Sequence, residues 1–245
     1  MTGHVLVTGS SGGIGAAVCR RFAVAGYAVT GVDLAPAPAD AAWTHVTCDL
    51  SVPGAVGAAG RAATERMPVD AVVHTAAVQV LGSAGRISSE DWSRSLQVNL
   101  LAVDELVGAC EESLRSRRGS VVAIGSVHAF ATTRHMAAYA TTKAALGGWV
   151  RAAALDLAPD VRVNGIAPGA VRTPMLEAGF ARRPGEGSVE DSLRALADKT
   201  PLQTVTGPDA IAAMVMSLCD PEVSGYVTGS MVVMDGGALL RLSTE

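Results

Sequence analysis

The sequence predicts an α/β fold, a doubly wound parallel sheet of about seven strands with helices on both faces. Short apolar runs alternate with helical stretches, and several of the runs are apolar throughout, as in strands that are covered on both faces. Repeated alternation of this kind implies parallel strands joined by right-handed crossovers. No linker, repeat or low-complexity block interrupts it, so we expect residues 1–245 to form a single domain. The expected strands are 4–8, 28–32, 44–48, 70–75, 119–125, 161–167 and 230–234, and the expected helices are 13–25, 54–66, 89–115, 138–158 and 207–219.

Composition and charge limit the possible functions. Hydrophobic residues make up 49% of the 245 residues and charged residues 17%, which is enough apolar material for a large core. The net charge of -4 argues against nucleic acid as a partner. No apolar stretch reaches the roughly 18 residues that a membrane helix needs, and the first residues resemble a strand, not a targeting signal. We therefore expect a cytoplasmic protein without membrane contact. The four cysteines are isolated, so neither a metal site nor a disulfide framework is predicted.

A glycine-rich segment, Thr8 to Gly15, follows the first expected strand and opens the first helix. Glycines permit a tight turn in which backbone amides approach a pyrophosphate, and the helix N-terminus adds partial positive charge. The spacing is Gly-x-x-x-Gly-x-Gly, which differs from the common dinucleotide fingerprint. An ordinary turn before a helix can have the same composition. The preceding strand, the following helix and an acidic residue farther along favour a dinucleotide site.

That acidic residue is Asp33, at the end of the second expected strand. A carboxylate there can accept hydrogen bonds from both adenosine ribose hydroxyls and would repel a 2′-phosphate. No lysine or arginine lies within the glycine segment or directly after Asp33, so the sequence favours NAD over NADP. A solvated carboxylate at a strand end is the alternative interpretation.

Tyr139 and Lys143 lie four residues apart on an expected helix and therefore share one face. A phenol is a poor base at neutral pH because its pKa is about 10, but a nearby ammonium and a positive nicotinamide both favour the phenolate. Ser126 ends the fifth expected strand, where the carboxyl ends of parallel strands face a ligand crevice. Its hydroxyl can donate to a substrate carbonyl, or it can simply cap a turn. Asn99 falls on the apolar face of its helix, so its amide must find buried partners.

Together these residues resemble the short-chain dehydrogenase/reductase family, and the resemblance extends from Thr8 to Gly237. The family's Asn-Ser-Tyr-Lys tetrad matches Asn99, Ser126, Tyr139 and Lys143, with the family's interval of 13 residues between serine and tyrosine. The resemblance implies a Rossmann-like fold and an NAD-dependent oxidoreductase that acts on CH–OH groups. It also implies that Lys143 holds the nicotinamide ribose and lowers the pKa of Tyr139, and that Asn99 holds a water. The residues expected to contact the cofactor are Gly9, Ser11, Gly13, Ile14, Gly15, Asp33, Asp49, Leu50, Ala76, Ala77, Tyr139, Lys143, Pro168, Gly169, Val171 and Thr173.

One segment departs from the family's pattern. The family usually has Asn-Asn-Ala-Gly after the fourth strand, and this chain has His74, Thr75, Ala76 and Ala77. The change removes the basis for two local expectations. One is the set of contacts made by the asparagine amide that His74 replaces, and the other is the close approach of the backbone to the cofactor beside Ala77. The change does not affect the residues expected to carry the chemistry.

The substrate site is expected at loops that follow the strands. Residues 174–200 are polar and glycine-containing, so we expect an insertion that acts as a substrate lid. Met175 and His128 are candidate substrate contacts beside Ser126 and Tyr139, whereas Arg182 and Arg183 could meet an anion or remain solvated. A small to medium secondary alcohol or its ketone is the expected substrate.

The resemblance implies a homotetramer or homodimer assembled through helices 89–115 and 138–158 and the last strand. The second of these helices contains many small residues that allow close approach between helices. Two other functions stay open at this point: a biosynthetic NADPH ketoreductase and, less favoured, a non-catalytic dinucleotide-sensing protein on the same fold.

Overall fold

The computed structural model describes residues 3–181 and 188–240. Seven parallel strands form one sheet in the order β3-β2-β1-β4-β5-β6-β7, which confirms the predicted fold class. Each predicted strand boundary agrees with the structure to within one residue. Because β2 and β4 flank β1 on opposite sides, the chain winds in opposite directions from the centre, and a crevice is expected at the carboxyl ends there. The strands are β1 (His4–Thr8), β2 (Ala28–Asp33), β3 (Thr44–Thr47), β4 (Ala71–His74), β5 (Ser120–Ile124), β6 (Arg162–Pro168) and β7 (Met231–Met234).

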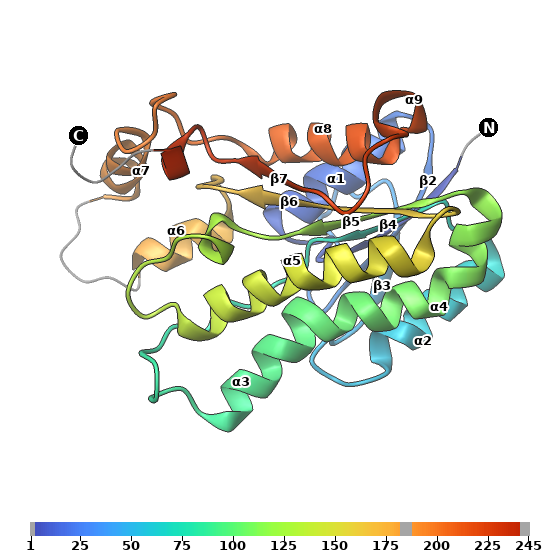
Figure 1. Ribbon diagram of the computed structural model, residues 1–245, viewed down its shortest axis with the longest axis horizontal. Helices are drawn as coiled ribbons and strands as arrows, with labels where there is room; N and C mark the ends of the chain where they lie inside the picture. Colours follow the sequence, from blue (N-terminus) through green and yellow to red (C-terminus); the bar gives the residue numbers. More distant parts are fainter. Residues whose placement is uncertain (1–2, 182–187, 241–245) are drawn as a thin grey trace.

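Helices cover both faces of the sheet and bury two separate cores (Figure 1). Alternate residues of a strand face opposite cores: Leu6 belongs to one, and Val5 and Val7 belong to the other. This explains why β1 is apolar along its length. One face carries α2 (Ala55–Arg66), α4 (Ala102–Arg117) and α5 (Ala137–Leu157), and the other carries α1 (Gly13–Val24) and α8 (Pro208–Cys219), with the short α9 (Pro221–Ser224) after α8.

The expected helix at 89–115 is not continuous. It consists of α3 (Ser89–Leu96), a π-helical turn (Gln97–Leu101) and α4. The backbone N–H of Ala102 donates to the carbonyl of Gln97, five residues back, instead of to the residue four back. The extra residue in this turn rotates the helix surface, so Asn99 is completely buried while Trp92 is only half-buried.

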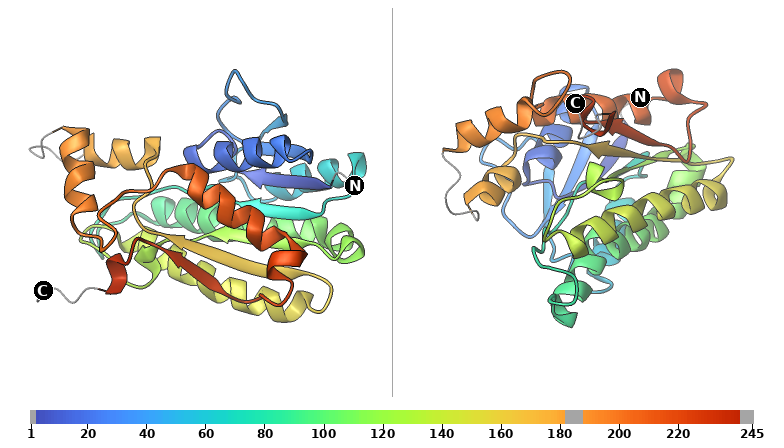
Figure 2. Two further views of the ribbon diagram at one scale, coloured as in Figure 1. Left: turned by 90° about the horizontal axis from the view of Figure 1, so that it is seen from above. Right: turned by 60° about the vertical axis from the view of Figure 1, so that its left-hand side comes forward.

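The described parts of 174–200 include two helices where a loop insertion was expected. They contain α6 (Pro174–Ala181) and α7 (Val189–Ala197), which lie beyond the carboxyl ends of the strands (Figure 2). A capping box between Ser188 and Asp191 begins α7. Arg182 and Arg183 lie outside the described residues. Within the described ranges, no helix is long and apolar enough to cross a membrane.

Candidate active site

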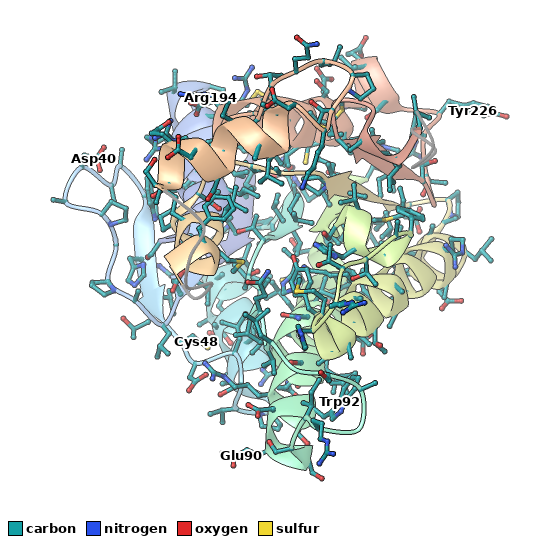
Figure 3. The ribbon with its side chains drawn as sticks, turned by 90° about the vertical axis from the view of Figure 1, so that its left-hand side faces the viewer. Asp40, Cys48, Glu90, Trp92, Arg194 and Tyr226 are labelled. Atoms are coloured by element: carbon teal, nitrogen blue, oxygen red, sulfur yellow. The ribbon has the colours of Figure 1, made fainter. Side chains whose placement is uncertain are left out.

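The carboxyl ends of the strands form the edge at which the predicted site residues gather. Figure 3 views the molecule from this side, where the loop after β2 with Asp40, the end of β3 with Cys48, α3 with Trp92 and α7 with Arg194 surround the strand ends. The glycine segment, the ends of β2 through β6 and the start of α5 all open onto this edge. The fold therefore brings together residues that are far apart in the sequence.

The glycine segment has no room for side chains at two positions. Gly9 has a φ of +73°, and a Cβ there would lie 2.7 Å from the amide nitrogen of Ala76. A Cβ at Gly15 would lie 2.0 Å from the carbonyl oxygen of Gly9. The Thr75 hydroxyl donates to the Thr8 carbonyl at 2.7 Å and fixes this approach. The segment thus lies tightly against the chain that follows β4, and α1 begins directly behind it.

Asp33 is held in a fixed position at the end of β2. Its carboxylate accepts the backbone N–H of Ser11 and of Ala35, each at 2.9 Å. The Ser11 hydroxyl in turn donates to the Ala35 carbonyl at 3.1 Å. Each carboxylate oxygen is therefore tied to the backbone and keeps further acceptor capacity. Asp33 also lies beside the glycine segment. A residue that binds an adenosine ribose would need this position.

The remaining expected cofactor positions lie along the same edge. Asp49 accepts two hydrogen bonds from Ser51, which hold the pKa of the carboxyl below its usual range. The side chain of Leu50 packs into the core, so only its backbone is available at the edge. Gly13 packs directly against Thr173. This contact joins the glycine segment to the chain after β6, where Pro168, Gly169 and Val171 also lie.

Ser126, Tyr139 and His128 form one cluster. The Ser126 hydroxyl accepts the backbone N–H of His128 at 3.2 Å, so it caps the short turn Val127–Ala129, as one interpretation of the sequence proposed. Ser126 also hydrogen-bonds the Tyr139 side chain. The His128 ring contacts the Tyr139 ring edge-on, with 5.8 Å between centroids. Burial raises the pKa of Tyr139 above its ordinary value, and the hydrogen bond with Ser126 opposes this rise.

Lys143 is buried beneath this cluster. Its Nζ donates to the carbonyl of Ile124 at 2.7 Å and lies 5.8 Å from the centroid of the Tyr139 ring. Burial lowers the pKa of Lys143 to about 8. The pKa of Tyr139 is set by its burial and by Ser126, not by Lys143 as the resemblance implied. The ammonium is placed close to the phenol and has two further N–H donors.

Asn99 connects three elements. Its Oδ1 accepts the Val78 backbone N–H at 2.8 Å, and its Nδ2 donates to the Val78 carbonyl at 3.0 Å and to the Thr142 hydroxyl at 2.9 Å. The amide is therefore fully engaged with protein groups. These bonds link the π turn to the loop after β4 and to α5, next to Lys143. Sequence reasoning missed Thr142, because its role depends on how the π turn meets α5.

Comparison with known proteins agrees with this geometry. The family profile described as Enoyl-(Acyl carrier protein) reductase matches residues 9–238, almost the whole chain. The chain belongs to the short-chain dehydrogenase/reductase family. It is therefore an oxidoreductase that shares the NAD(P)-dependent fold of that family.

Characterised relatives differ in their substrates. The chain is 33% identical to 3beta-hydroxysteroid dehydrogenase 1 of Eggerthella lenta, over 96% of this chain and 93% of that protein. It is 28% identical to the aldohexose dehydrogenase of Thermoplasma acidophilum, with a TM-score of 0.94 over 99% of this chain and 96% of that one. It is also 28% identical to a 3-oxoacyl (acyl-carrier-protein) reductase of Agrobacterium tumefaciens solved with NADP, with a TM-score of 0.85 over 96% and 93% of the two chains.

His74 is where this short-chain dehydrogenase/reductase departs from the family's usual asparagine. Its side chain is fully buried, and Nδ1 lies 2.8 Å from the Thr8 hydroxyl. The residue pairs in register with Thr8 on β1 and with Ala123 on β5, so it lies in the middle of the sheet. The histidine therefore ties β1 to β4 from inside the protein, behind the cofactor edge.

Two of the loop segments expected to line the substrate site of this short-chain dehydrogenase/reductase are joined to each other. Gly82 donates its N–H to the His135 carbonyl at 2.8 Å, and Ser83 hydrogen-bonds the His135 ring at 2.8 Å. Met175 on α6 is 39% exposed, so its side chain has surface to offer to a ligand. Arg172, just before α6, forms ion pairs with Glu177 on α6 and with Glu190 on α7. Helices α6 and α7 thus share one cation.

A separate hollow lies at the opposite, amino edge of the sheet. It has a volume of about 600 Å³ and is lined by His4, Tyr27, Trp43 and Arg66, among others. None of the candidate catalytic or cofactor residues lines it. In a parallel α/β sheet the ligand crevice lies at the carboxyl ends. We therefore assign the site of this short-chain dehydrogenase/reductase to the other edge.

Proposed function

We propose that this protein transfers a hydride between NAD(H) and a secondary alcohol or its ketone. One observation carries the proposal: Ser126, the Tyr139 ring and a buried Lys143 lie together at the cofactor edge, with the Lys143 ammonium 5.8 Å from the centroid of the Tyr139 ring. A non-catalytic dinucleotide sensor would use Lys143 to hold the cofactor but would not need Ser126 and Tyr139 placed together beside it. Burying a cation is costly, so such a residue needs a function.

The geometry is consistent with a separate role for each of Ser126, Tyr139 and Lys143. Ser126 accepts the His128 N–H with one lone pair and keeps its proton, which can be donated to the Tyr139 oxygen or to a substrate oxygen. Oxidation of an alcohol moves a hydride from the carbinol carbon to the cofactor and the hydroxyl proton to Tyr139. The two free N–H donors of Lys143 would hold the hydroxyls of the cofactor ribose. A nicotinamide bound there would accept or supply the hydride, and in its oxidised form its positive charge would favour the Tyr139 phenolate.

Asn99 would act through its backbone and through the elements it joins. The side chain of Asn99 is already hydrogen-bonded to Val78 and Thr142. The water that the family resemblance assigns to Asn99 would therefore be bound by its backbone carbonyl. Turnover is tested directly by screening secondary alcohols with NAD⁺ and NADP⁺, and ketones with the reduced cofactors, by absorbance at the NADH band. Absence of turnover across steroids, sugars and short aliphatic alcohols would count against the proposal.

Cofactor preference is the first testable consequence. Asp33 should make kcat/KM at least about thirtyfold higher with NAD(H) than with NADP(H), because its fixed carboxylate bonds a ribose and repels a phosphate. Asp33→Ala should narrow the ratio by about tenfold. Asp40→Ala is the matched control, since it removes the same charge from an exposed position of the same loop. Equal kcat/KM values for the two cofactors in the wild-type protein would contradict the assignment.

The main alternative is a biosynthetic NADPH ketoreductase. One similar protein, the 3-oxoacyl (acyl-carrier-protein) reductase solved with NADP, supports this alternative. The conformation of Asp33 favours NAD instead, because both of its oxygens are fixed beside the glycine segment. The measured cofactor ratio decides between the two.

The substrate pocket is proposed between residues 77–85, residues 127–135 and the two helices of 174–200. His128 is the side chain best placed to influence specificity, because its ring lies against Tyr139. Met175 would add an apolar contact from α6. Ion pairs from one arginine to both helices would let α6 and α7 move together as a lid. A small to medium secondary alcohol or ketone fits this proposal. We further propose a cytoplasmic location, which the four unpaired cysteines fit.

Self-association is the second testable consequence. The small residues of α5 divide into two sets: Gly147, Ala153 and Ala154 are buried within the subunit, whereas Ala144, Gly148 and Ala152 lie toward the surface. Together with Leu155, which is 81% exposed, the second set forms a stripe at helical spacing beside α4.

We propose that a dimer or tetramer forms by close packing of this stripe against a second copy. Light scattering at micromolar concentration should give an assembly mass. Ala152→Glu should reduce that mass to the 24.8 kDa monomer, because it places a charge in an apolar contact. Ala62→Glu on α2, also exposed, should leave the mass unchanged. A wild-type monomer would overturn the proposal.

A further inference from the structure

The buried histidine at the end of β4 has an unexplained hydrogen-bonding atom. His74 is completely buried, and among the described residues no group lies at hydrogen-bond geometry to its Nε2. A buried polar atom without a partner destabilises the folded state, so its retention needs a reason. Burial, reinforced by the positive charge of Lys143, lowers the pKa of His74 to about 3. The ring is therefore neutral at any working pH and carries one proton, on one nitrogen.

The hydrogen bonds around His74 indicate which nitrogen carries that proton. The Thr8 hydroxyl accepts the backbone N–H of Ala76 at 3.5 Å and lies 2.8 Å from Nδ1. The Thr8 hydroxyl can donate to Nδ1 or accept from it; when it donates, Nδ1 is the acceptor. The neutral ring then has its hydrogen on Nε2. Nε2–H is thus a donor, enclosed on the face of the sheet that α4 and α5 cover.

An acceptor for this donor exists in the π turn. In a regular α-helix the N–H of Ala102 would bond the carbonyl of Val98, four residues back. Here it bonds the carbonyl of Gln97 instead, which leaves the Val98 carbonyl without its regular donor. The backbone of Val98 interacts with the His74 ring and opposes the lowering of its pKa, as a carbonyl facing a ring N–H does. The Val98 carbonyl and the His74 ring are therefore close enough to interact, outside the geometry of a regular hydrogen bond.

We propose that His74 is a positioning residue whose Nε2–H supports the Val98 carbonyl and thereby fixes the turn that carries Asn99. The inference rests on the function proposed above. It describes one chain of hydrogen bonds, from Ala76 through Thr8 and His74 to Val98, that connects the cofactor edge to the turn beside Asn99. Asn99 continues it to Thr142, next to Lys143. His74 never touches a reacting atom and acts only through this chain.

Two measurements on the cofactor-free protein test the contact without any substrate. In ¹⁵N-histidine NMR, the signal that disappears in His74→Gln should report the neutral Nε2–H tautomer unchanged from pH 5 to pH 9. A protonated ring or the Nδ1–H tautomer in that range would overturn the inference. Hydrogen exchange at Gln97–Leu101 should be faster in His74→Leu than in the wild-type protein. Unchanged exchange there would also overturn it.

Kinetics separate positioning from simple structural support. His74→Leu should lower kcat about tenfold or more with little change in the KM for NAD⁺, because Asn99 and Lys143 lose their alignment. His74→Gln, which can accept from Thr8 and donate to Val98, should recover kcat to within about threefold. His4→Leu is the matched control: His4 is a buried histidine at the opposite edge, bonded to Thr30 and to the Met67 carbonyl.

The control should lose stability and keep its kcat. Equal kcat in His74→Leu, His4→Leu and the wild-type protein would show a purely structural histidine and refute the proposal. If the wild-type protein has no oxidoreductase activity, the proposed function fails, and NMR and hydrogen exchange still decide whether the contact exists.

Discussion

Replacing Tyr139 with phenylalanine should lower kcat by at least about a hundredfold, because the ring remains and the only group that exchanges the substrate proton is lost. The phenol is almost completely buried, so water cannot easily take its place. NADH binding should survive, since Lys143 and the glycine segment are untouched. Kinetics with the best alcohol from the screen, together with NADH fluorescence titration, measure both effects.

The chain provides its own control, because it has three tyrosines. Tyr226 is fully exposed, so Tyr226→Phe should leave kcat unchanged. The pH dependence gives a further check. Since burial raises the pKa of Tyr139, the phenolate is scarce at neutral pH, and alcohol oxidation should accelerate as pH rises. Near-wild-type turnover in Tyr139→Phe would exclude Tyr139 as the acid–base group.

Replacing Lys143 with methionine should have two opposite effects, a fall in kcat of more than about a hundredfold and a gain in stability. The pKa of Lys143 falls from 10.5 to about 8 in the folded protein, which corresponds to a cost of about 3 kcal/mol at neutral pH. Loss of the bond to the Ile124 carbonyl offsets part of the gain, so the melting temperature should rise by only a few degrees.

The pH dependence of the melting temperature shows whether the burial of Lys143 is the cause of the gain in stability. Below pH 8 the folded and unfolded states both hold the Lys143 proton, and the folded state bears the full burial cost. Between pH 8 and 10.5 only the unfolded state holds it, so wild-type stability gains from Lys143 as pH rises. The advantage of Lys143→Met should therefore shrink from pH 7 to pH 9.5. Lys199, the only other lysine, is exposed, and Lys199→Met should show no such dependence.

The same lysine pair makes the pKa of Lys143 directly measurable. Lysine-labelled protein should give two side-chain NMR signals, and Lys143→Met assigns them. The Lys143 signal should titrate near pH 8 in the cofactor-free protein. A Lys143 pKa near 10.5 would remove the basis of the stability prediction.

Local chemistry in the sequence determined the sheet and most of the site positions. Parallel strands that are buried on both faces must be apolar throughout. An apolar run such as that of β5 can therefore be recognised as a strand from the sequence alone. Tyr139 and Lys143 depend only on helical spacing, and Asp33 on its place at a strand end. These features follow from neighbours in the chain, and the resemblance to the short-chain dehydrogenase/reductase family rests on them.

Features that depend on contacts between distant segments required the tertiary structure. The helix predicted at 89–115 has a pattern that fits one continuous helix, and only packing against β4 and α5 reveals the π turn that buries Asn99. The helices α6 and α7 lie in a stretch whose polar composition resembles a loop, because their stability comes from capping and from Arg172. A neutral His74, or a Lys143 with a lowered pKa, cannot be seen in a sequence, since burial sets both, and burial is a property of the assembled fold.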